Sequence, residues 1–350
     1  RRLGGGGMGE VFVVEHRELG RCFAAKILHA RLAAVPHVVD RMRLEGQTLA
    51  RLSHPNVVAI QGFDTTPEGR PYLVIELLSG QSLTETLQAR GALPVGVAIQ
   101  YGKELLSGLA AAHDIGVVHR DVKPDNVFLA ESPERGAPVL KVIDFGIARV
   151  LPTAPPEAPK PLVIPTATGE VLGTPRFLSP EGALGLRVDE RADVYAAALV
   201  IYTMVTGRGP FDHVETEEAV LGAHVNETPA PPSEHALEPV PAELDALLLR
   251  ALSKEPAARF GSAREFKTEL DKVGELLARP AGWLETTAYR RHEGGNELPE
   301  DAPPPSVVAG ESVPRLSRRA VGTVVVFAVL ALLASVVAVV SVGIHLRGAP

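Results

Sequence analysis

The sequence predicts an α+β fold made of two lobes, and three observations support this prediction. Residues 80–275 carry mostly helical patterns, with capping-box sequences at Ser82–Glu85 and Ser262–Glu265. Residues 1–79 contain one stretch with helical spacing, Val38–Leu52. The rest of residues 1–79 consists of short apolar runs between glycine, proline and polar turns, which predict strands, as in Val11–Val14, Phe23–Ala25 and Tyr72–Ile75. We therefore expect a small β-rich N-lobe followed by a larger helical C-lobe.

Two further segments follow the lobes. Residues 276–319 contain a proline-rich run, and proline blocks helices, so we expect an extended juxtamembrane linker. Residues 320–344 contain no charged side chain, and about 20 apolar residues suffice to cross a bilayer. A buried core helix is the alternative, but it is usually shorter. The positive charges of Arg315, Arg318 and Arg319 precede this segment, which favours a cytoplasmic location for the lobes of a single-pass protein in the inner or plasma membrane.

Composition excludes several classes of protein. The chain has 35 basic and 42 acidic residues and a net charge of −7, whereas a nucleic-acid-binding protein would show a basic stripe. The single cysteine, Cys22, rules out an internal disulfide framework. No group of cysteine and histidine residues has the spacing of a zinc site.

The N-terminal glycine tract has the spacing G-x-G-x-x-G-x-V, from Gly4 through Gly6 and Gly9 to Val11. Glycines allow the backbone to approach phosphates closely and to present N–H donors to them. A flexible linker would explain the consecutive glycines equally well. A dinucleotide-binding fold uses the same spacing, but a helix should then follow. Residues 11–14 predict a strand instead, which favours a glycine hairpin between two strands.

Lys26 ends the apolar strand Phe23–Ala25. It could simply extend its charge into water at the strand edge. It could also stabilise bound phosphates, and such a cation needs an acid to hold it. Glu45, in the predicted helix, is the natural candidate, although a solvated charge on the helix face is the alternative.

Two more motifs follow in order, His119–Asn126 (HRDVKPDN) and Val142–Gly146 (VIDFG). Together with the glycine tract and Lys26, they resemble the protein kinase family, and most closely the bacterial branch of eukaryotic-type serine/threonine kinases. The resemblance covers about residues 1–275. It implies a two-lobed kinase fold that transfers the γ-phosphate of ATP to serine and threonine hydroxyls of protein substrates.

The resemblance also implies the catalytic roles. Asp121 would accept the proton of the substrate hydroxyl, and Asn126 and Asp144 would hold Mg²⁺, with Mn²⁺ as an alternative ion. Lys123 would lie near the γ-phosphate, a feature of serine/threonine kinases. Lys26 would pair with the α- and β-phosphates while Glu45 holds it. A pseudokinase scaffold that binds ATP without turnover is the alternative, but none of the essential positions is lost.

For ATP, the resemblance implies that Ile75 is the gatekeeper and that backbone groups of Glu76 and Leu78 pair with adenine. The full set of expected nucleotide contacts is Leu3, Gly4, Gly5, Gly6, Gly7, Met8, Gly9, Val11, Ala24, Lys26, Ile75, Glu76 and Leu78.

Other positions are expected to support or regulate the site. Asp193 resembles the buried aspartate that anchors the catalytic loop, and Glu181 should pair with Arg259. Arg120 is the residue that receives an activation-segment phosphate in this family, and Thr166 and Thr168 are the expected phosphorylation sites. The resemblance also raises a homodimer formed through the N-lobe as an option.

Overall fold

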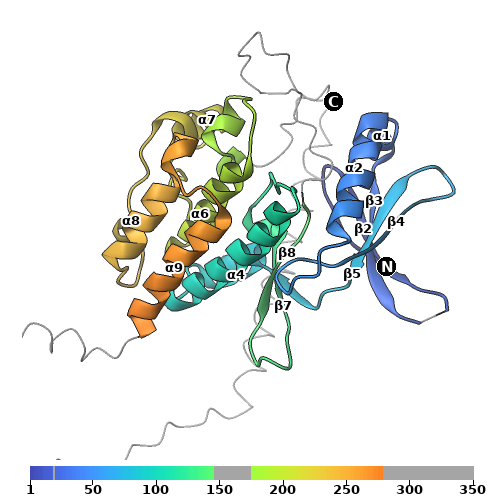
Figure 1. Cartoon of the computed structure of the whole chain (residues 1–350), viewed down its shortest axis with the longest axis horizontal. Coiled ribbons are helices and arrows are strands. Elements are labelled where there is room, and N and C mark those ends of the chain that lie inside the picture. The colour runs from blue at the N-terminus through green and yellow to red at the C-terminus, as the bar shows by residue number, and fades with distance from the viewer. Residues whose placement is uncertain (19, 146–174, 279–350) are drawn as a thin grey trace, which may run out of the picture. The chain divides into compact units, whose positions relative to one another are not determined.

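The computed structural model describes residues 1–18, 20–145 and 175–278, and it shows a β-rich lobe and a helical lobe (Figure 1). The two-lobed α+β prediction is therefore confirmed. Thr166, Thr168 and the apolar segment 320–344 lie outside the described residues. In the three described ranges, no helix is both long enough and apolar enough to cross a membrane.

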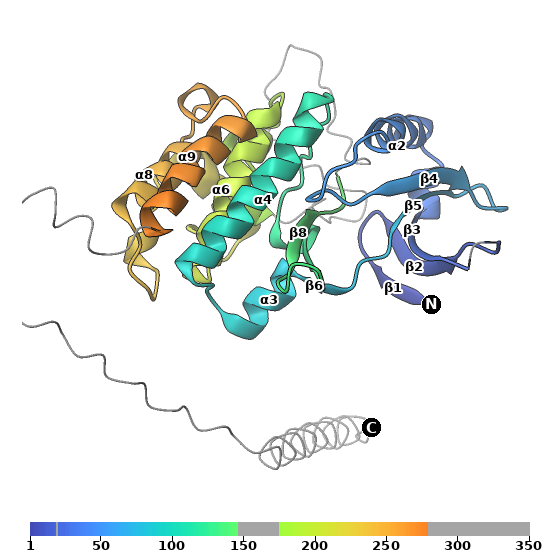
Figure 2. The ribbon, with the colours of Figure 1, turned by 60° about the horizontal axis from the view of Figure 1, so that its bottom comes forward.

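The N-lobe is an antiparallel five-stranded sheet with helices on one side (Figures 1 and 2). Helix α2 (Pro36–Leu49) follows the short α1 (Ala30–Ala33) and ends three residues before the predicted Leu52. Its buried face packs on the sheet through Val38 and Met42. The strands are, in spatial order, β1 (Arg2–Gly5), β2 (Gly9–Glu15), β3 (Cys22–Leu28), β5 (Pro71–Glu76) and β4 (Ile60–Thr65).

The C-lobe is built around helix α6 (Glu190–Thr206), which is buried along most of its length and packs against α4 (Val95–Asp114) and α9 (Ala263–Ala278). Its large side chains Tyr195 and Tyr202 are fully buried. The remaining helices are α3 (Leu83–Arg90), α5 (Pro180–Ala183), α7 (Glu217–Asn226) and α8 (Ala242–Ala251). A three-stranded sheet of β6 (Gly80–Ser82), β7 (Val127–Ala130) and β8 (Val139–Val142) faces the N-lobe side.

The predicted helix caps are largely confirmed. Ser82 accepts a hydrogen bond from the Glu85 N–H at 3.2 Å, and the Glu85 carboxylate accepts one from the Ser82 N–H at 2.7 Å, which completes a capping box. At the start of α9, Ser262 caps Glu265, but the Glu265 carboxylate accepts from the Gly261 N–H at 2.7 Å instead.

Two connections position the lobes beside each other. Residues 77–79 join β5 of the larger sheet to β6 of the smaller one. The segment between α2 and β4 is also fastened to β8, because Asn56 donates its side-chain amide to the Leu140 carbonyl at 2.9 Å and its own carbonyl accepts from the Val142 N–H at 2.8 Å. Asn56 is buried, so these bonds are protected from competing water.

Candidate active site

The glycine tract forms a hairpin between β1 and β2, as the sequence predicted. The turn is closed by a 2.9 Å hydrogen bond from the Gly6 N–H to the Gly9 carbonyl. A Cβ at Gly9 would lie 2.2 Å from the Ile27 carbonyl oxygen, so no larger residue fits there without displacing the backbone of β3. At Gly6 and Gly7, a Cβ would meet nothing within 4 Å. The tip of the hairpin therefore has room around it for a ligand.

Two side chains hold the tip of the hairpin. His29 makes a 2.9 Å hydrogen bond with the Gly6 carbonyl, and Arg31 donates to the Gly7 carbonyl at 2.7 Å. Both side chains come from the end of β3 and the start of α1. The sequence analysis did not identify either residue, since neither belongs to a motif.

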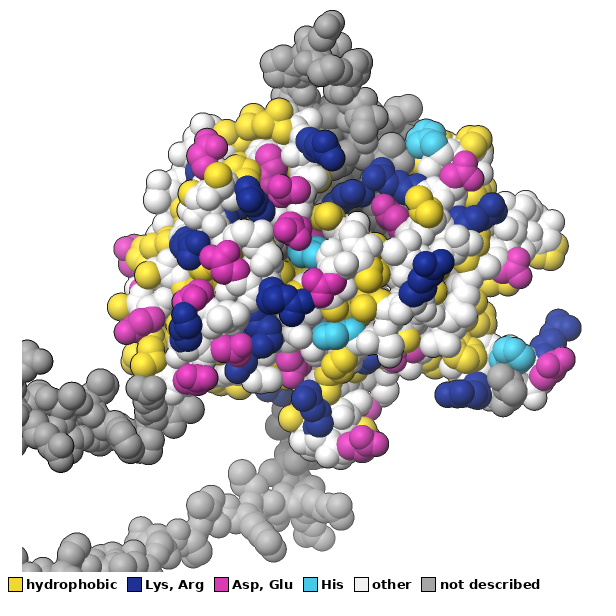
Figure 3. All heavy atoms as spheres, in the orientation of Figure 1, with side chains coloured by type: hydrophobic (Ala, Val, Ile, Leu, Met, Phe, Trp, Pro, Cys, Tyr) yellow, Lys and Arg dark blue, Asp and Glu magenta, His cyan; other side chains and the backbone are white. Residues whose placement is uncertain are grey.

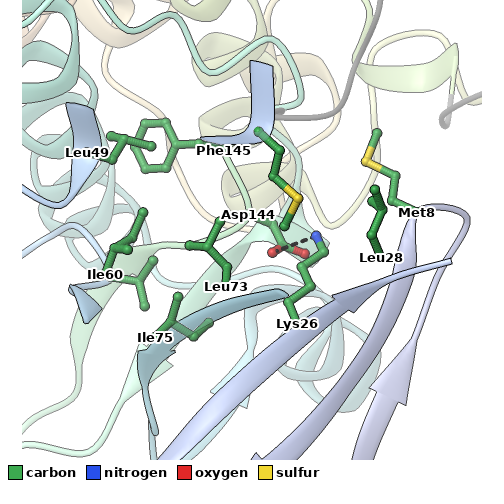
Figure 4. Close-up of a pocket in the computed structure, with 11 residues that line it drawn as sticks. Met8, Lys26, Leu28, Leu49, Ile60, Leu73, Ile75, Asp144 and Phe145 are labelled. Carbon is green, nitrogen blue, oxygen red and sulfur yellow. Dashed lines mark ion pairs between the residues drawn. The ribbon is translucent and has the colours of Figure 1, made fainter. Parts of the chain in front are cut away.

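Lys26 and Asp144 form an ion pair at the centre of the site, with Nζ 2.9 Å from Oδ1 (Figure 4). Lys26 comes from β3, and Asp144 lies just after β8 with a left-handed backbone (φ 55°). Burial raises the pKa of Asp144, but the charge and hydrogen bond of Lys26 outweigh it and hold the pKa below its usual value. Asp144 is therefore a carboxylate at neutral pH.

Glu45 does not hold Lys26 in this arrangement, which corrects the prediction. Its Oε1 accepts from Arg41 Nε at 3.1 Å and lies 3.4 Å from Arg120 Nη1. The physical reason is that two guanidinium groups already satisfy this carboxylate, while Asp144 satisfies Lys26. Burial raises the pKa of Glu45 more than the two arginines lower it.

The catalytic-loop residues meet around the carboxylate of Asp121. Asn126 donates its amide Nδ2 to the Asp121 carbonyl at 2.8 Å and to Oδ2 at 3.0 Å. Lys123 Nζ lies 3.3 Å from the same Oδ2. The predicted residues are thus brought together, and Asp121 is oriented by two neighbours.

Asp193 anchors this loop, as predicted. Its carboxylate accepts from the backbone N–H of His119 at 2.7 Å and of Arg120 at 2.8 Å. These bonds hold Arg120 in a left-handed conformation (φ 62°), which is unfavourable for a residue with a Cβ. His113 of α4 adds a third bond to Asp193 at 2.8 Å, and the sequence analysis did not identify this residue.

The predicted pair of Glu181 and Arg259 is confirmed as a buried bidentate ion pair. Arg259 Nη1 lies 2.8 Å from Glu181 Oε1, and Nη2 lies 2.7 Å from Oε2. Arg259 also donates to three backbone carbonyls, so its guanidinium is fully used. The pair connects α5 to the loop before α9.

A cavity of about 40 Å³ lies beside the Lys26–Asp144 pair (Figure 4). Ile75, the predicted gatekeeper, lines it, and Phe145 reaches it from the residue after Asp144. Phe145 also contacts the His119 ring, with centroids 4.6 Å apart. The other lining residues are apolar and come from the glycine hairpin, α2, the N-lobe sheet and the segment between α2 and β4: Met8, Leu28, Met42, Leu49, Val58, Ile60 and Leu73.

The predicted adenine contacts lie where the two sheets join. Ala24 pairs with Ile75 across the neighbouring strands β3 and β5, near the end of β5 that leads to β6. The Glu76 N–H donates to the Ala59 carbonyl at 2.9 Å, which leaves only its carbonyl for a nucleotide. The Glu76 side chain binds Lys141 at 2.8 Å. Leu78 lies in the segment between β5 and β6.

The donor set at Asn126 and Asp144 fits a magnesium ion. Asn126 uses its amide nitrogen on Asp121, which leaves its amide oxygen for a cation, and Asp144 supplies a carboxylate. Mg²⁺ prefers such oxygen ligands and usually takes only one or two from the protein, the rest coming from phosphates and water. Consistent with so small a set, no cluster of three or more His, Cys, Asp or Glu side chains able to hold a metal occurs in the described part of the chain.

Comparison with known proteins gives a consistent result. Residues 1–270 match the protein kinase domain family. The chain is 38% identical over 318 residues to serine/threonine-protein kinase Pkn1 of Myxococcus xanthus, covering 90% of this chain and 43% of that protein. It is 38% identical over 293 residues to serine/threonine-protein kinase PknB of Mycolicibacterium smegmatis, covering 82% of this chain and 44% of that protein.

A solved structure is similar as well. The crystal structure of the Mycobacterium tuberculosis PknI kinase domain matches with a TM-score of 0.59 and 30% identity, covering 78% of this chain and 94% of that one. The chain spans less than half the length of the two curated relatives described above.

Proposed function

The chain belongs to the protein kinase domain family, and we propose that it transfers the γ-phosphate of ATP to serine and threonine hydroxyls of other proteins. One observation carries this proposal. Asp121, Lys123 and Asn126 are hydrogen-bonded or ion-paired around a single carboxylate, on a loop whose backbone is fixed by Asp193. Phosphoryl transfer requires positioning and charge neutralisation rather than covalent chemistry by the protein, and this arrangement provides both.

In the proposed reaction, Asp121 orients the substrate hydroxyl and takes its proton as the oxygen attacks the γ-phosphorus, while the bond from the γ-phosphorus to the β–γ bridging oxygen breaks and ADP leaves. Asn126 and Lys123 engage Oδ2 of Asp121, which fixes the plane of the carboxylate. Lys123 also carries a positive charge on a long, adaptable side chain 3.3 Å from Asp121, so it can follow the γ-phosphate and offset its charge.

The nucleotide would lie under the glycine hairpin and against the C-terminal end of β5. Backbone N–H groups of the hairpin would bind the phosphates, and Lys26 would neutralise them. Bound Mg²⁺, held by Asn126 and Asp144, would offset the charge of the β- and γ-phosphates.

The proposal extends to where the enzyme acts. Residues 320–344 are uncharged, and Arg315, Arg318 and Arg319 stand just before them, which supports a single membrane helix with the kinase on the cytoplasmic side. We place phosphorylation of Thr166 or Thr168, by another copy of the chain, as its activating step, since both precede the substrate-side elements at α5. The proposal also includes Mn²⁺ as an alternative to Mg²⁺ and a dimer formed through the N-lobe.

A transfer assay tests the activity. The full chain is incubated with γ-labelled ATP, Mg²⁺ and casein as a generic substrate, and phosphoamino acids are identified after hydrolysis. Wild type should label serine and threonine, and Asp121→Asn should lose about 10²–10⁴-fold in rate, which is the usual contribution of general-base catalysis. Asp125→Asn, an exposed neighbour on the same loop, is the matched control for folding. Equal rates in wild type and Asp121→Asn would contradict the assignment.

A further inference from the structure

Three successive carbonyl groups of the glycine hairpin are bound by residues that follow β3. The Gly6 carbonyl lies 2.9 Å from His29 Nε2, and the Gly7 carbonyl accepts from Arg31 Nη2 at 2.7 Å. The Met8 carbonyl accepts from the backbone N–H of His29 at 2.9 Å. Because a carbonyl can only accept, Nε2 of His29 carries the proton of its hydrogen bond. His29 and Arg31 therefore hold the tip of the hairpin from one side.

The side chains of His29 and Arg31 contribute little to the helix that they begin. His29 is the N-cap residue of α1, but its side chain makes no capping hydrogen bond. The helix has only four residues and buries none of them. Both side chains are instead bound to glycine carbonyls, so their effect falls on the hairpin.

These bonds also fix the direction of two N–H donors. The peptide bonds of the hairpin are trans, and in a planar trans unit the C=O of one residue and the N–H of the next point in opposite directions. Since the Gly6 and Gly7 carbonyls turn toward His29 and Arg31, the N–H groups of Gly7 and Met8 turn away from them. Within the residues that the structure describes, neither N–H donates to a backbone carbonyl.

The two N–H groups lie at the border of the proposed nucleotide site. Met8 lines the same cavity as Lys26 and Asp144 (Figure 4). A Cβ at Gly7 would meet nothing within 4 Å, so an anion can approach the backbone there. Successive N–H groups that point away from the same segment can bind one anion together. A phosphate group that Lys26 neutralises is such an anion.

We infer that His29 and Arg31 are positioning residues for the nucleotide, which hold the hairpin so that the Gly7 and Met8 N–H groups bind a phosphate group. This inference rests on the proposed kinase function and adds two residues that lie outside the motifs of the family. Glycine loses more conformational freedom on ordering than any other residue, so a run of four glycines is costly to order. The bonds from His29 and Arg31 offset part of this cost in the protein itself, which leaves less to be lost on binding.

The exposure of these bonds sets the size of the expected effect. Both side-chain bonds are exposed to water, so each is a hydrogen bond of ordinary net strength. The loss of one such bond corresponds to a change of about two- to tenfold in an equilibrium constant. We expect single substitutions to weaken phosphate binding within this range, and the double substitution to weaken it further.

Isothermal titration calorimetry with ADP and with adenosine tests the inference, on the full chain in detergent with Mg²⁺. His29→Leu and Arg31→Leu should each raise the Kd of ADP by about two- to tenfold. The Kd of adenosine should stay within about twofold, because adenosine has no phosphate for the N–H groups to bind. His29→Gln should keep most of the wild-type affinity for ADP, since its amide nitrogen can donate to the same carbonyl without adding a charge. Arg31→Lys keeps both the charge and a donor, and should behave in the same way.

Arg17→Leu is the matched control for the loss of a positive charge. Arg17 lies in the exposed turn between β2 and β3, and Figure 3 shows charged side chains at this projecting end of the N-lobe. Glu15 pairs with Cys22 beside this turn, whereas Gly9 pairs with Leu28 at the other end of the two strands. The turn is therefore about 20 Å from the glycine hairpin. Arg17→Leu should leave the Kd of ADP and of adenosine within about twofold of wild type.

Three results would overturn the inference. One is an equal loss of affinity for ADP and adenosine in His29→Leu and Arg31→Leu, because a general effect on the N-lobe would then explain both. Another is an unchanged affinity for ADP in both variants. The third is a loss in Arg17→Leu as large as that in Arg31→Leu. A wild-type chain that binds neither ADP nor adenosine would contradict the proposed kinase function, and the inference would fall with it.

Discussion

The carboxylate of Asp193 holds the backbone N–H of Arg120 at 2.8 Å, although the two residues are 73 positions apart. This bond keeps Arg120 in a left-handed conformation directly before Asp121. A non-glycine residue held there costs about 1–3 kcal/mol, so the loop needs an external anchor to stay in this shape.

Replacing Asp193 by asparagine should therefore reduce catalysis more than its small change in volume suggests. The amide offers one acceptor oxygen to two backbone N–H groups and turns an N–H₂ group toward the other. We expect kcat to fall about tenfold or more, which corresponds to about 1.4 kcal/mol in the barrier. Transfer kinetics and thermal unfolding are measured together. Asp189→Asn, at the exposed N-cap of the same helix, should change neither, since asparagine caps as well as aspartate. An unaltered kcat in Asp193→Asn would show that the anchor is dispensable.

Alanine substitutions in the glycine hairpin should change the free energy of unfolding by different amounts at Gly9, at its base, and at Gly4, in β1. Gly9→Ala places a Cβ 2.2 Å from the Ile27 carbonyl, so β2 and β3 must separate, at a cost of about 1–3 kcal/mol in the free energy of unfolding. Gly4→Ala meets nothing within 4 Å and should leave that free energy within about 0.5 kcal/mol of wild type. Urea denaturation of both variants is the measurement. Similar losses in the two would mean that general flexibility, and not the close approach to β3, requires Gly9.

Much of this site could be predicted from local patterns, because each motif is a short run of residues that lie close together in the sequence. The strands at Val11–Val14 and Tyr72–Ile75, the glycine hairpin and the capping box at Ser82 follow from period, turn chemistry and spacing. Asp193 and the Glu181–Arg259 pair were expected from the family resemblance and are found as expected.

The ion pairs of Lys26 and Glu45 could not be predicted, because each side chain has several oppositely charged candidates as its partner. Lys26 could have paired with Glu45 or Asp144, and Glu45 with Lys26 or with arginines; the sequence contains all of them. The choice depends on the position of α2 relative to the catalytic loop, which no local pattern encodes. The i, i+4 spacing of Arg41 and Glu45 was the one signal in the sequence that favoured the observed pair.

Breaking the Glu181–Arg259 pair should strongly destabilise the C-lobe. Arg259 is fully buried and Glu181 is 8% exposed, so Arg259→Met leaves a carboxylate without its partner. Removing one member of a buried pair costs about 3–5 kcal/mol. Chemical denaturation gives the value. Arg264→Met, which removes an exposed partner of Asp114, should cost less than about 1 kcal/mol. A loss in Arg259→Met no larger than that of Arg264→Met would contradict the structural role.

His224 should make the stability of the C-lobe depend on pH. Burial, together with the nearby Lys254 cation, lowers its pKa from 6.5 to about 4, against a smaller opposing effect of Asp212. Its Nδ1 bonds with the Tyr195 hydroxyl at 3.0 Å, and the pKa of that hydroxyl is itself raised by burial.

The direction of this pH dependence follows from which state, folded or unfolded, protonates His224 at the higher pH. The unfolded chain protonates near pH 6.5 and the folded chain only near pH 4, so the contribution is complete above about pH 6.5 and is lost as pH falls to 4. The loss amounts to about 3 kcal/mol. In denaturation curves at several pH values, His224→Gln should flatten this decline, while the exposed His213→Gln should not. An equal slope in wild type and His224→Gln would exclude the assignment.

The membrane helix proposed for residues 320–344 should anchor the protein to membranes. In cell fractions, the chain 1–350 should sediment with membranes and resist extraction by alkaline carbonate, whereas 1–319 should be released. Truncation also shortens the chain and removes residues 345–350, so a matched variant of full length is needed. Leu330→Arg combined with Leu333→Arg keeps the length and adds about 2.5–3.5 kcal/mol of insertion cost per arginine. This variant should behave like 1–319. Recovery of the full chain in the soluble fraction, or no effect of the two arginines, would count against a membrane helix.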